Sequence, residues 1–247
     1  MAWPSTPTTT GSGFGSGSGT SIATSGSVAV TAGDLIYVSV CWEGADSVIT
    51  CSDGGVNTYT QVFGSNLNNG TGNPEPWNQC FRAVAATTTS VTITASYGGG
   101  ADSRTFRTIT VLVFHPDAAG TISLDGTPAG TGGISASIAT GNVTTSTQAA
   151  NCGLAITSYA FYGDDPSSEQ INGTAADNIT TNNGAEVWML RYTNGFTGQG
   201  AATIGFNNWS AGLATFKIEP VAVAATPIPF VGSFGRSGGR PHRRYPL

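Results

Sequence analysis

Residues 35–42 (LIYVSVCW) alternate between two faces of an extended chain, and this pattern constrains the fold more than any other stretch. β-Branched and aromatic residues repeating with a period of two are typical of a β-strand. Turns follow at residues 44–46 and 52–55, so residues 33–63 are predicted to form a three-stranded meander. One face of the first strand carries Ile36, Val38, Val40 and Trp42, and the other carries Leu35, Tyr37, Ser39 and Cys41.

Similar patterns recur along the chain, and none has the 3.6-residue period of a helix. Residues 105–115 (TFRTITVLVFH) are apolar on both faces over their second half, which predicts a central, fully buried strand. Residues 151–161 (NCGLAITSYAF) are expected to form a second core strand. The sequence therefore predicts an all-β fold: an antiparallel, jelly-roll-like β-sandwich over residues 21–219. Further strands are expected at residues 77–85, 90–97, 186–192, 201–206 and 213–219.

Two segments of the predicted sandwich resemble each other. ATSGSVAVTAGDLIYVSV from residue 23 and ATGNVTTSTQAANCGLAITS from residue 139 both run from a Thr/Gly turn, through a Thr/Val strand, into an apolar strand. They indicate either a duplicated unit, with two similar halves meeting near residues 117–133, or successive hairpins of one jelly roll. We favour the single jelly roll.

The two ends of the chain differ from its middle. Residues 1–20 are rich in Gly, Ser and Thr and are predicted to form an extended N-terminal arm. Residues 220–247 are rich in Pro and Arg and are predicted to form a second arm. This arm is expected to dock on an acidic surface of a shell protein or of another copy. The proposed docking residues are Arg236, Arg240, Arg243, Arg244, Tyr245, Phe230 and Phe234.

Charged residues make up 9% of the chain, against roughly 25% in an ordinary globular protein. Up to residue 235 there are five basic and fourteen acidic residues, a formal charge of −9, which argues against nucleic acid as a partner of the body. No apolar run approaches the ~20 residues that span a membrane. The N-terminal residues lack the basic and apolar regions of a signal peptide, so we expect synthesis in the cytoplasm.

No catalytic constellation is visible, so we expect neither enzymatic activity nor a cofactor. His115 is interpreted as a strand-end histidine that makes one backbone hydrogen bond, because no nucleophile elbow accompanies it. Asp164, Asp165 and Glu169 supply oxygen ligands of the kind calcium prefers, although a solvated acidic loop is the favoured reading.

Two cysteines and one tryptophan carry more specific hypotheses. Cys41 and Cys51 would face each other across a hairpin, so they could form a disulfide, or they could be small core residues. Trp77 lies beside Pro76 at the edge of a predicted loop, and it is the best candidate for stacking on a sugar.

The motifs AGDLIYVSVCW, SDGGVNTYTQV, VTITASY, TFRTITVLVF and GLATFKI resemble β-sandwich modules of bacteriophage virion proteins and bacterial surface proteins. The resemblance covers about residues 25–218 and implies a jelly-roll or immunoglobulin-like sandwich without catalytic residues. We therefore expect a virion structural protein, a capsid decoration or accessory shell protein that contacts other virion proteins and copies of itself. The alternative is a carbohydrate- or receptor-binding module of a phage tail or cell surface.

Overall fold

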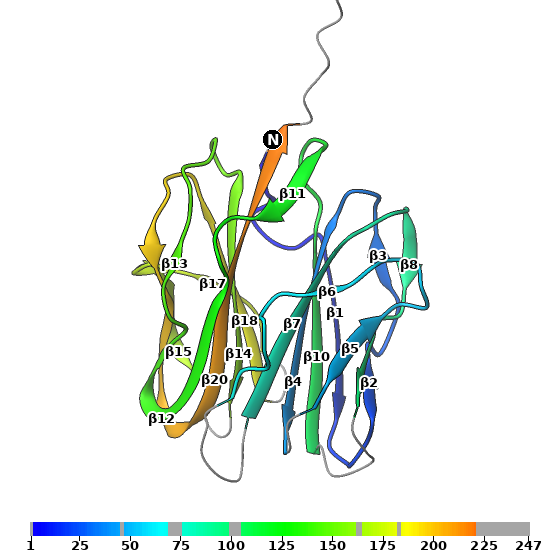
Figure 1. The fold of residues 1–247 in the computed structure, drawn as a ribbon, viewed down its shortest axis with the longest axis vertical. Coiled ribbons are helices and arrows are strands. Elements are labelled where there is room, and N and C mark those ends of the chain that lie inside the picture. Colours follow the sequence, from blue (N-terminus) through cyan, green and yellow to red (C-terminus); the bar gives the residue numbers. More distant parts are fainter. Residues whose placement is uncertain are drawn as a thin grey trace, which may run out of the picture.

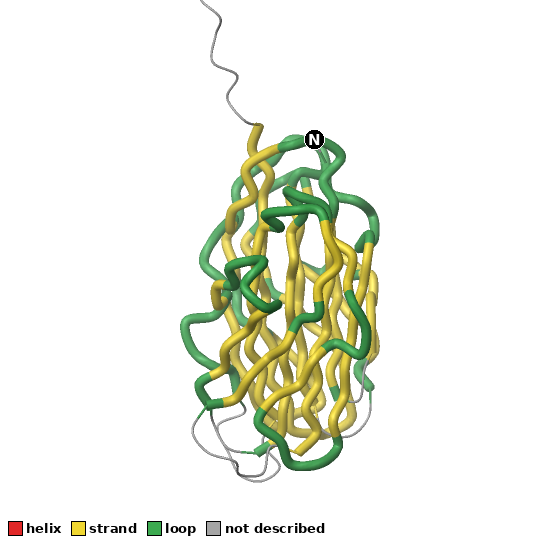
Figure 2. Tube along the Cα trace, turned by 90° about the vertical axis from the view of Figure 1, so that its right-hand side faces the viewer, coloured by secondary structure: helices red, strands yellow, loops and turns green. Residues whose placement is uncertain are grey.

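The computed structural model describes residues 2–44, 47–68, 76–98, 105–161, 165–181 and 184–220. Every regular element in these residues is a β-strand, so the predicted all-β sandwich is confirmed. The strands run along the length of the molecule (Figure 2). Among the described residues there is no helix that could cross a lipid bilayer.

The strands form two halves, and each backbone ladder among the described residues joins strands of the same half (Figure 1). The change from one half to the other falls between Phe114 and Gly120. The strands of the first half are β1 (Thr9–Gly15), β2 (Ser21–Ala23), β3 (Val28–Val30), β4 (Leu35–Glu43), β5 (Ile49–Ser52), β6 (Thr60–Gln61), β7 (Pro76–Val84), β8 (Thr89–Val91), β9 (Thr94–Tyr97) and β10 (Thr105–Phe114).

The second half is built in the same manner. Its last strand is long enough to take part in both of its layers. The strands are β11 (Gly120–Leu124), β12 (Ala129–Ala139), β13 (Val143–Thr144), β14 (Gly153–Phe161), β15 (Ser167–Ile171), β16 (Thr174–Ala175), β17 (Asp177–Thr181), β18 (Ala185–Tyr192), β19 (Thr197–Gly198) and β20 (Gly200–Pro220).

The first half pairs its strands in a nested order. β1 pairs with β10, β2 with β9, β3 with β8 and β4 with β7, all antiparallel. The resulting inner sheet has the order β1-β10-β4-β7-β6, and an outer layer of β2-β9-β5 and β3-β8 covers it.

The second half repeats this nested order, with the long strands β12 and β20 each taking the place of two strands and with β11 and β16 added. The start of β12 pairs with the later part of β20, and the end of β12 pairs with the start of β20. β13 pairs with β19, and β14 pairs with β18. β14 also pairs with β20, as β4 does with β10, and β17 lies beside β18 as β6 lies beside β7. In the described residues, the two halves therefore share one nested order of strand pairing.

A pair of hydrogen bonds marks the same point in both halves. The Thr24 amide donates to the Ile93 carbonyl oxygen at 3.0 Å, and the Ile93 amide donates to the Thr24 Oγ1 at 3.3 Å. In the second half, the Thr140 amide donates to the Gly200 carbonyl oxygen at 3.0 Å, and the Gly200 amide donates to the Thr140 Oγ1 at 3.0 Å. Both threonines are buried. The shared order therefore extends to single hydrogen bonds.

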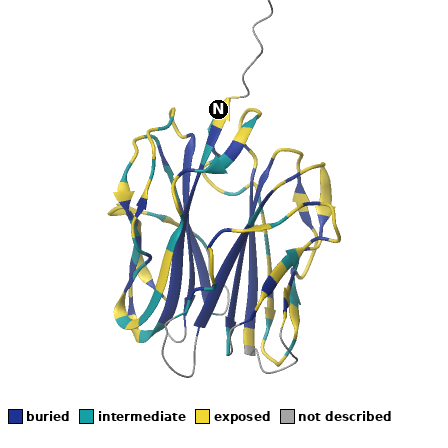
Figure 3. Ribbon diagram, in the orientation of Figure 1, coloured by how far each residue is buried: buried dark blue, intermediate teal, exposed yellow. Residues whose placement is uncertain are grey.

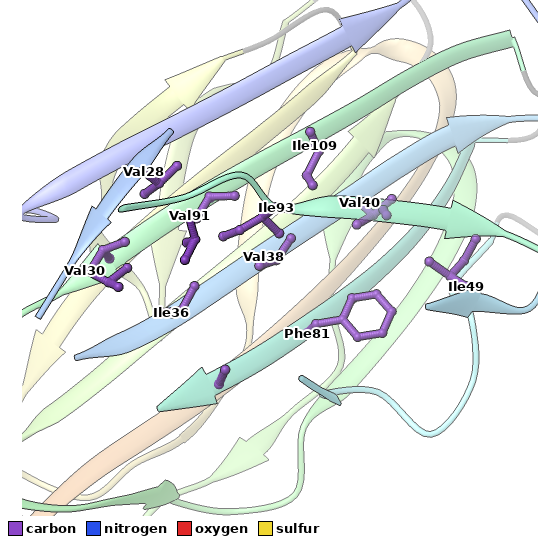
Figure 4. Packing of buried hydrophobic residues seen from close by; sticks show 14 of the residues in the cluster. Val28, Val30, Ile36, Val38, Val40, Ile49, Phe81, Val91, Ile93 and Ile109 are labelled. Atoms are coloured by element: carbon purple, nitrogen blue, oxygen red, sulfur yellow. The ribbon is translucent and has the colours of Figure 1, made fainter. Parts of the chain in front are cut away.

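The two inner sheets pack against each other and bury the centre of the molecule (Figure 3). The two faces of β4 enter different cores, as its alternation predicts. Ile36, Val38 and Val40 pack inside the first half (Figure 4), whereas Leu35 and Tyr37 pack against the second half. The predicted central strands are confirmed, because β10 lies between β1 and β4, and β14 lies between β18 and β20.

The predicted meander over residues 33–63 is wrong in its pairing. β4, β5 and β6 form near the expected places, yet none of them pairs with another: β4 pairs with β10 and β7, β5 with β9, and β6 with β7. The partners of β4 and β5 lie beyond the neighbouring strands in sequence, and short-range turn signals do not specify such pairings.

The predicted N-terminal arm over residues 1–20 is also wrong, because β1 is the edge strand of the first inner sheet. Its glycines have a packing reason. A Cβ atom on Gly11 would collide with Val28, and one on Gly13 would collide with the Ala23 backbone. Small residues let the outer layer close over β1, so a composition typical of a flexible arm here permits close packing. The predicted C-terminal arm lies almost entirely outside the described residues, which end at Pro220.

Candidate functional site

Trp77 does not offer its ring to a ligand, so this sequence-based expectation is wrong. Trp77 is 6% exposed, and its ring stacks on Trp42 with a centroid distance of 5.9 Å and an interplanar angle of 11°. Its Nε1 donates a hydrogen bond to the Gly44 carbonyl oxygen at 2.6 Å. The predicted loop edge is the start of β7, where Trp77 stands opposite Trp42 in the ladder and faces the first core.

The possible disulfide between Cys41 and Cys51 is also contradicted, since both thiols are free. Cys41 lies in the inner sheet, with its Sγ 3.8 Å from the Tyr159 carbonyl oxygen of the second half. Cys51 lies in the outer layer, opposite Ala95. Burial, together with the charge of Asp53, raises the pKa of the Cys51 thiol to about 12. The alternative reading as core residues fits Cys41, which is buried, and Cys51 is partly buried.

The acidic loop does not form a metal site in the described part of the chain. Asp165 is exposed and Glu169 is half-buried, while Asp164 lies outside the described residues. Within the residues that the structure covers, no three His, Cys, Asp or Glu side chains gather closely enough to hold a metal ion.

The seven docking residues predicted in the C-terminal arm lie outside the described residues. The structure does show Pro220, the residue from which this segment continues. Pro220 ends β20 and pairs with Gly120 at the start of β11. This two-stranded ribbon of β11 and the end of β20 lies at the same end of the molecule as the N-terminus (Figure 1).

His115 contacts a carboxylate instead of the predicted backbone group. Its Nδ1 lies 2.5 Å from the Asp34 Oδ1, and the Asp34 Oδ2 accepts a hydrogen bond from the Thr31 amide at 2.7 Å. Asp34 is 3% exposed, whereas the imidazole is 49% exposed. The pair joins the end of β10 to the start of β4, which gives this histidine a role in holding two strand ends together.

Two further buried carboxylates organise turns. The Asp53 carboxylate accepts hydrogen bonds from the Asn57 amide at 3.0 Å, the Asn57 Nδ2 at 2.6 Å and the Tyr59 hydroxyl at 3.2 Å. Asp125 accepts from the Ser146 hydroxyl and the Tyr192 hydroxyl, both at 2.6 Å. Burial opposes ionisation of Asp125, but these hydrogen bonds prevail and lower its pKa. Both carboxylates stabilise the fold.

The junction between the two halves contains a polar contact and a clasp. The Ser39 and Ser158 hydroxyls, from β4 and β14, meet at 2.5 Å, and the Asn78 Nδ2 donates to the Ser158 Oγ at 3.0 Å. Trp3 closes the junction at one end. It is 1% exposed, and its Nε1 donates to the Cys152 carbonyl oxygen at 2.9 Å. The Trp3 amide also donates to the Asn151 carbonyl oxygen at 2.9 Å.

An open groove lies on the first half, between the edge of its outer layer at β5 and the edge of its inner sheet at β6. Its volume is about 530 Å³. The Asn66 Nδ2 donates to the Ser47 carbonyl oxygen at 2.6 Å, and the Gln79 Nε2 donates to the Asn66 Oδ1 at 3.2 Å. These bonds tie the two sheet edges together across the groove. The groove is lined by Ser47, Val48, Ile49, Gln61, Ser65, Asn66, Gln79 and Gly98.

The groove and Pro220 lie toward opposite ends of the molecule. β4 and β14 run in the same direction, since Ser39 meets Ser158 and Cys41 meets the Tyr159 carbonyl. β20 is antiparallel to β14, so it ends where β4 begins. The groove instead begins at Ser47, just beyond the far end of β4.

Sequence reasoning missed this groove because its side chains come from four separated segments and carry no motif. A weak signal was present in three amide residues (Gln61, Asn66 and Gln79) within a short stretch of a chain poor in charge. Comparison with known proteins adds no further guide, since no family model, curated protein or solved structure matches the chain.

Proposed function

We propose that the chain is a non-enzymatic structural protein of a virion, an accessory or decoration protein of a phage capsid that docks through residues 221–247. The observation that carries this proposal is the position of Pro220. The chain leaves the double sandwich there, at the end opposite the groove. Such a molecule has one end for attachment and another that points away from the attachment surface.

Charge supports docking through this segment. The residues up to Pro220 include five basic and fourteen acidic residues, a formal −9. The segment that follows has no acidic residue and carries Arg236, Arg240, Arg243 and Arg244. Guanidinium groups pair well with carboxylates, so an acidic shell surface or another copy of the body suits them. Phe230, Phe234 and Tyr245 supply apolar contacts beside these charges.

The construction of the body fits the same role. We infer from the nested pairing that each half is a jelly roll, an architecture that recurs in viral capsid proteins. Two inner sheets packed face to face, with Trp3 clasping both halves, give a single stiff body. A stiff body transmits a docking geometry from one end to the other.

Truncation after Pro220 tests the proposal. The truncated protein should keep its far-UV circular dichroism spectrum, because all described strands precede the cut. Phage particles purified on a density gradient from cells that make the full chain should carry the protein. The truncated form should remain in the fractions of unassembled protein. A variant with the four arginines changed to serine should bind and then dissociate at a lower ionic strength, since exposed ion pairs are weak and screened.

Two results would contradict the proposal. One is a folded, truncated protein that joins the particles at full occupancy. The other is a full-length protein that never sediments with particles made in the same cells.

A further inference from the structure

The groove on the first half has the dimensions of a ligand site. Its volume of about 530 Å³ lies within the roughly 300–1,000 Å³ of small-molecule sites. Three of its lining residues lie in strands, Ile49 in β5, Gln61 in β6 and Gln79 in β7, and the other five lie in the loops beside these strands.

The exposed surface of the groove is more apolar than polar, and the polar groups of its described lining are uncharged. Gln61 and Asn66 contribute carboxamides and Ser65 contributes a hydroxyl, while Ser47 and Gln79 are buried. Each carboxamide holds a donor and an acceptor in one plane. Val48, 73% exposed, adds an aliphatic surface at the rim. Among the residues that the structure describes, no charged side chain lines the groove.

Hydrogen bonds hold the floor of the groove in place before any ligand arrives. Gln79 is fully buried, and its Oε1 accepts from the Cys80 amide at 2.8 Å while its Nε2 donates to the Asn66 Oδ1 at 3.2 Å. The Ser47 hydroxyl donates to the Gly98 carbonyl oxygen at 2.6 Å. A fixed array of this kind lowers the ordering cost of binding.

The second half of the fold differs from the first at one of these carboxamides. An offset of 107 residues relates β7 to β18, so Gln79 corresponds to Glu186 and Phe81 to Trp188. Gln61 stands opposite Phe81, as Asn178 stands opposite Trp188. One half therefore has a neutral carboxamide where the other has a carboxylate. The neutral version belongs to the half with the open groove.

We propose that this groove binds a neutral oligosaccharide. Sugar hydroxyls both donate and accept, and they match carboxamides and serine hydroxyls, while a C–H face of the ring can rest on Val48. Acidic sugars fit poorly, because the body is strongly acidic and no cation is found among the described lining residues. An extended peptide is the competing occupant, but β6 offers it an edge of only two residues, Thr60 and Gln61.

Titration of the ¹⁵N-labelled full chain with chitotriose, cellotriose and mannotriose, each to about 10 mM, tests the proposal, since millimolar dissociation constants are within reach of such a titration. At least one sugar should shift the signals of residues 47–49, 61, 65–66 and 98. Gln61→Ala should weaken that binding about tenfold, the loss expected for one or two hydrogen bonds. Thr60→Ala is the matched control. Thr60 precedes Gln61 in the same strand, so its side chain points to the opposite face, and removing it should leave the affinity unchanged.

Three outcomes would overturn the proposal. One is the absence of shifts at these residues with all three sugars. Another is equal affinity in the Gln61→Ala variant and the wild type. The last is binding of an uncharged Ser/Thr-rich decapeptide at the same residues, with no response to any sugar. Because none of these measurements involves residues 221–247, the result is independent of the docking function proposed above.

Discussion

Replacing Trp3 with alanine removes the clasp between the two halves. The indole is 1% exposed, and its ring meets Phe114 edge-on at a centroid distance of 6.2 Å. Burying about 200 Å² of aromatic surface contributes on the order of 5 kcal/mol at 25 cal/mol per Å². The substitution also leaves the Cys152 carbonyl oxygen without the Nε1 donor. Measured losses for buried Trp→Ala substitutions are about 3–5 kcal/mol, so we expect about 4 kcal/mol.

Urea denaturation followed by far-UV circular dichroism measures this loss. With an m-value of about 3 kcal/mol per M, the midpoint should fall by about 1.3 M. Trp3→Phe should lose about 1–1.5 kcal/mol, because it keeps most of the buried area and loses one hydrogen bond. Phe206→Ala removes an aromatic side chain that is 75% exposed, and it should change stability by no more than about 0.5 kcal/mol. A Trp3→Ala loss as small as that of Phe206→Ala would refute the clasp.

Three further substitutions or modifications follow from the buried groups. Asp125→Asn should lower the free energy of unfolding by about 2 kcal/mol at pH 7, since hydrogen bonds to a charged group are lost. Folding lowers the pKa of Asp125, so its stabilising contribution is present above the ordinary value of 3.8 and disappears as the pH falls through the value in the folded protein. The variant should therefore lose less stability on acidification than the wild type, and an unchanged acid dependence would contradict this role of Asp125. Iodoacetamide at pH 8 should label no cysteine of the folded protein within minutes and all four in urea, because Cys41, Cys80 and Cys152 are buried and burial raises the pKa of the partly buried Cys51 to about 12. A prompt reaction of Cys51 in the folded protein would contradict this. Trp77→Ala should lower the free energy of unfolding by about 3–5 kcal/mol, because the ring is buried against Trp42. At temperatures where the variant is folded, oligosaccharide binding at the groove should be unchanged. Loss of binding in the folded variant would indicate that Trp77 contacts the ligand.

The elements of this fold could be predicted where local patterns decide them. The alternation of residues 35–42 identified both faces of β4, and the continuous apolar run near Val111 identified β10 as a central strand. The partners of these strands could not be predicted, because β4 meets β10 across about seventy residues and no turn signal carries that information. The Thr/Val resemblance near residues 23 and 139 spans β3 and β4 in the first half and β13 and β14 in the second, strands that hold matching places in the nested order.

The candidate sites depended even more on distant contacts. Gly-rich residues near the N-terminus were read as a flexible arm, because composition does not show that Gly11 and Gly13 make room for the outer layer. The position of Trp77 beside a proline suggested exposure, yet the ladder places the ring against Trp42. The groove was invisible because Ser47 and Gln79 meet through Asn66 only once both sheets are formed.

Cross-strand amide–amide nuclear Overhauser effects, measured on the perdeuterated full chain, test the shared pairing order of the two halves most directly. Such effects report backbone neighbours within a ladder, and strands in facing sheets are about 10 Å apart and too distant to give them. The account predicts ladders that join β4 to β10 and β7, and a matching set that joins β14 to β20 and β18. A ladder between β4 or β7 and β14 or β20 would contradict it, because the chain would then be one interleaved sandwich.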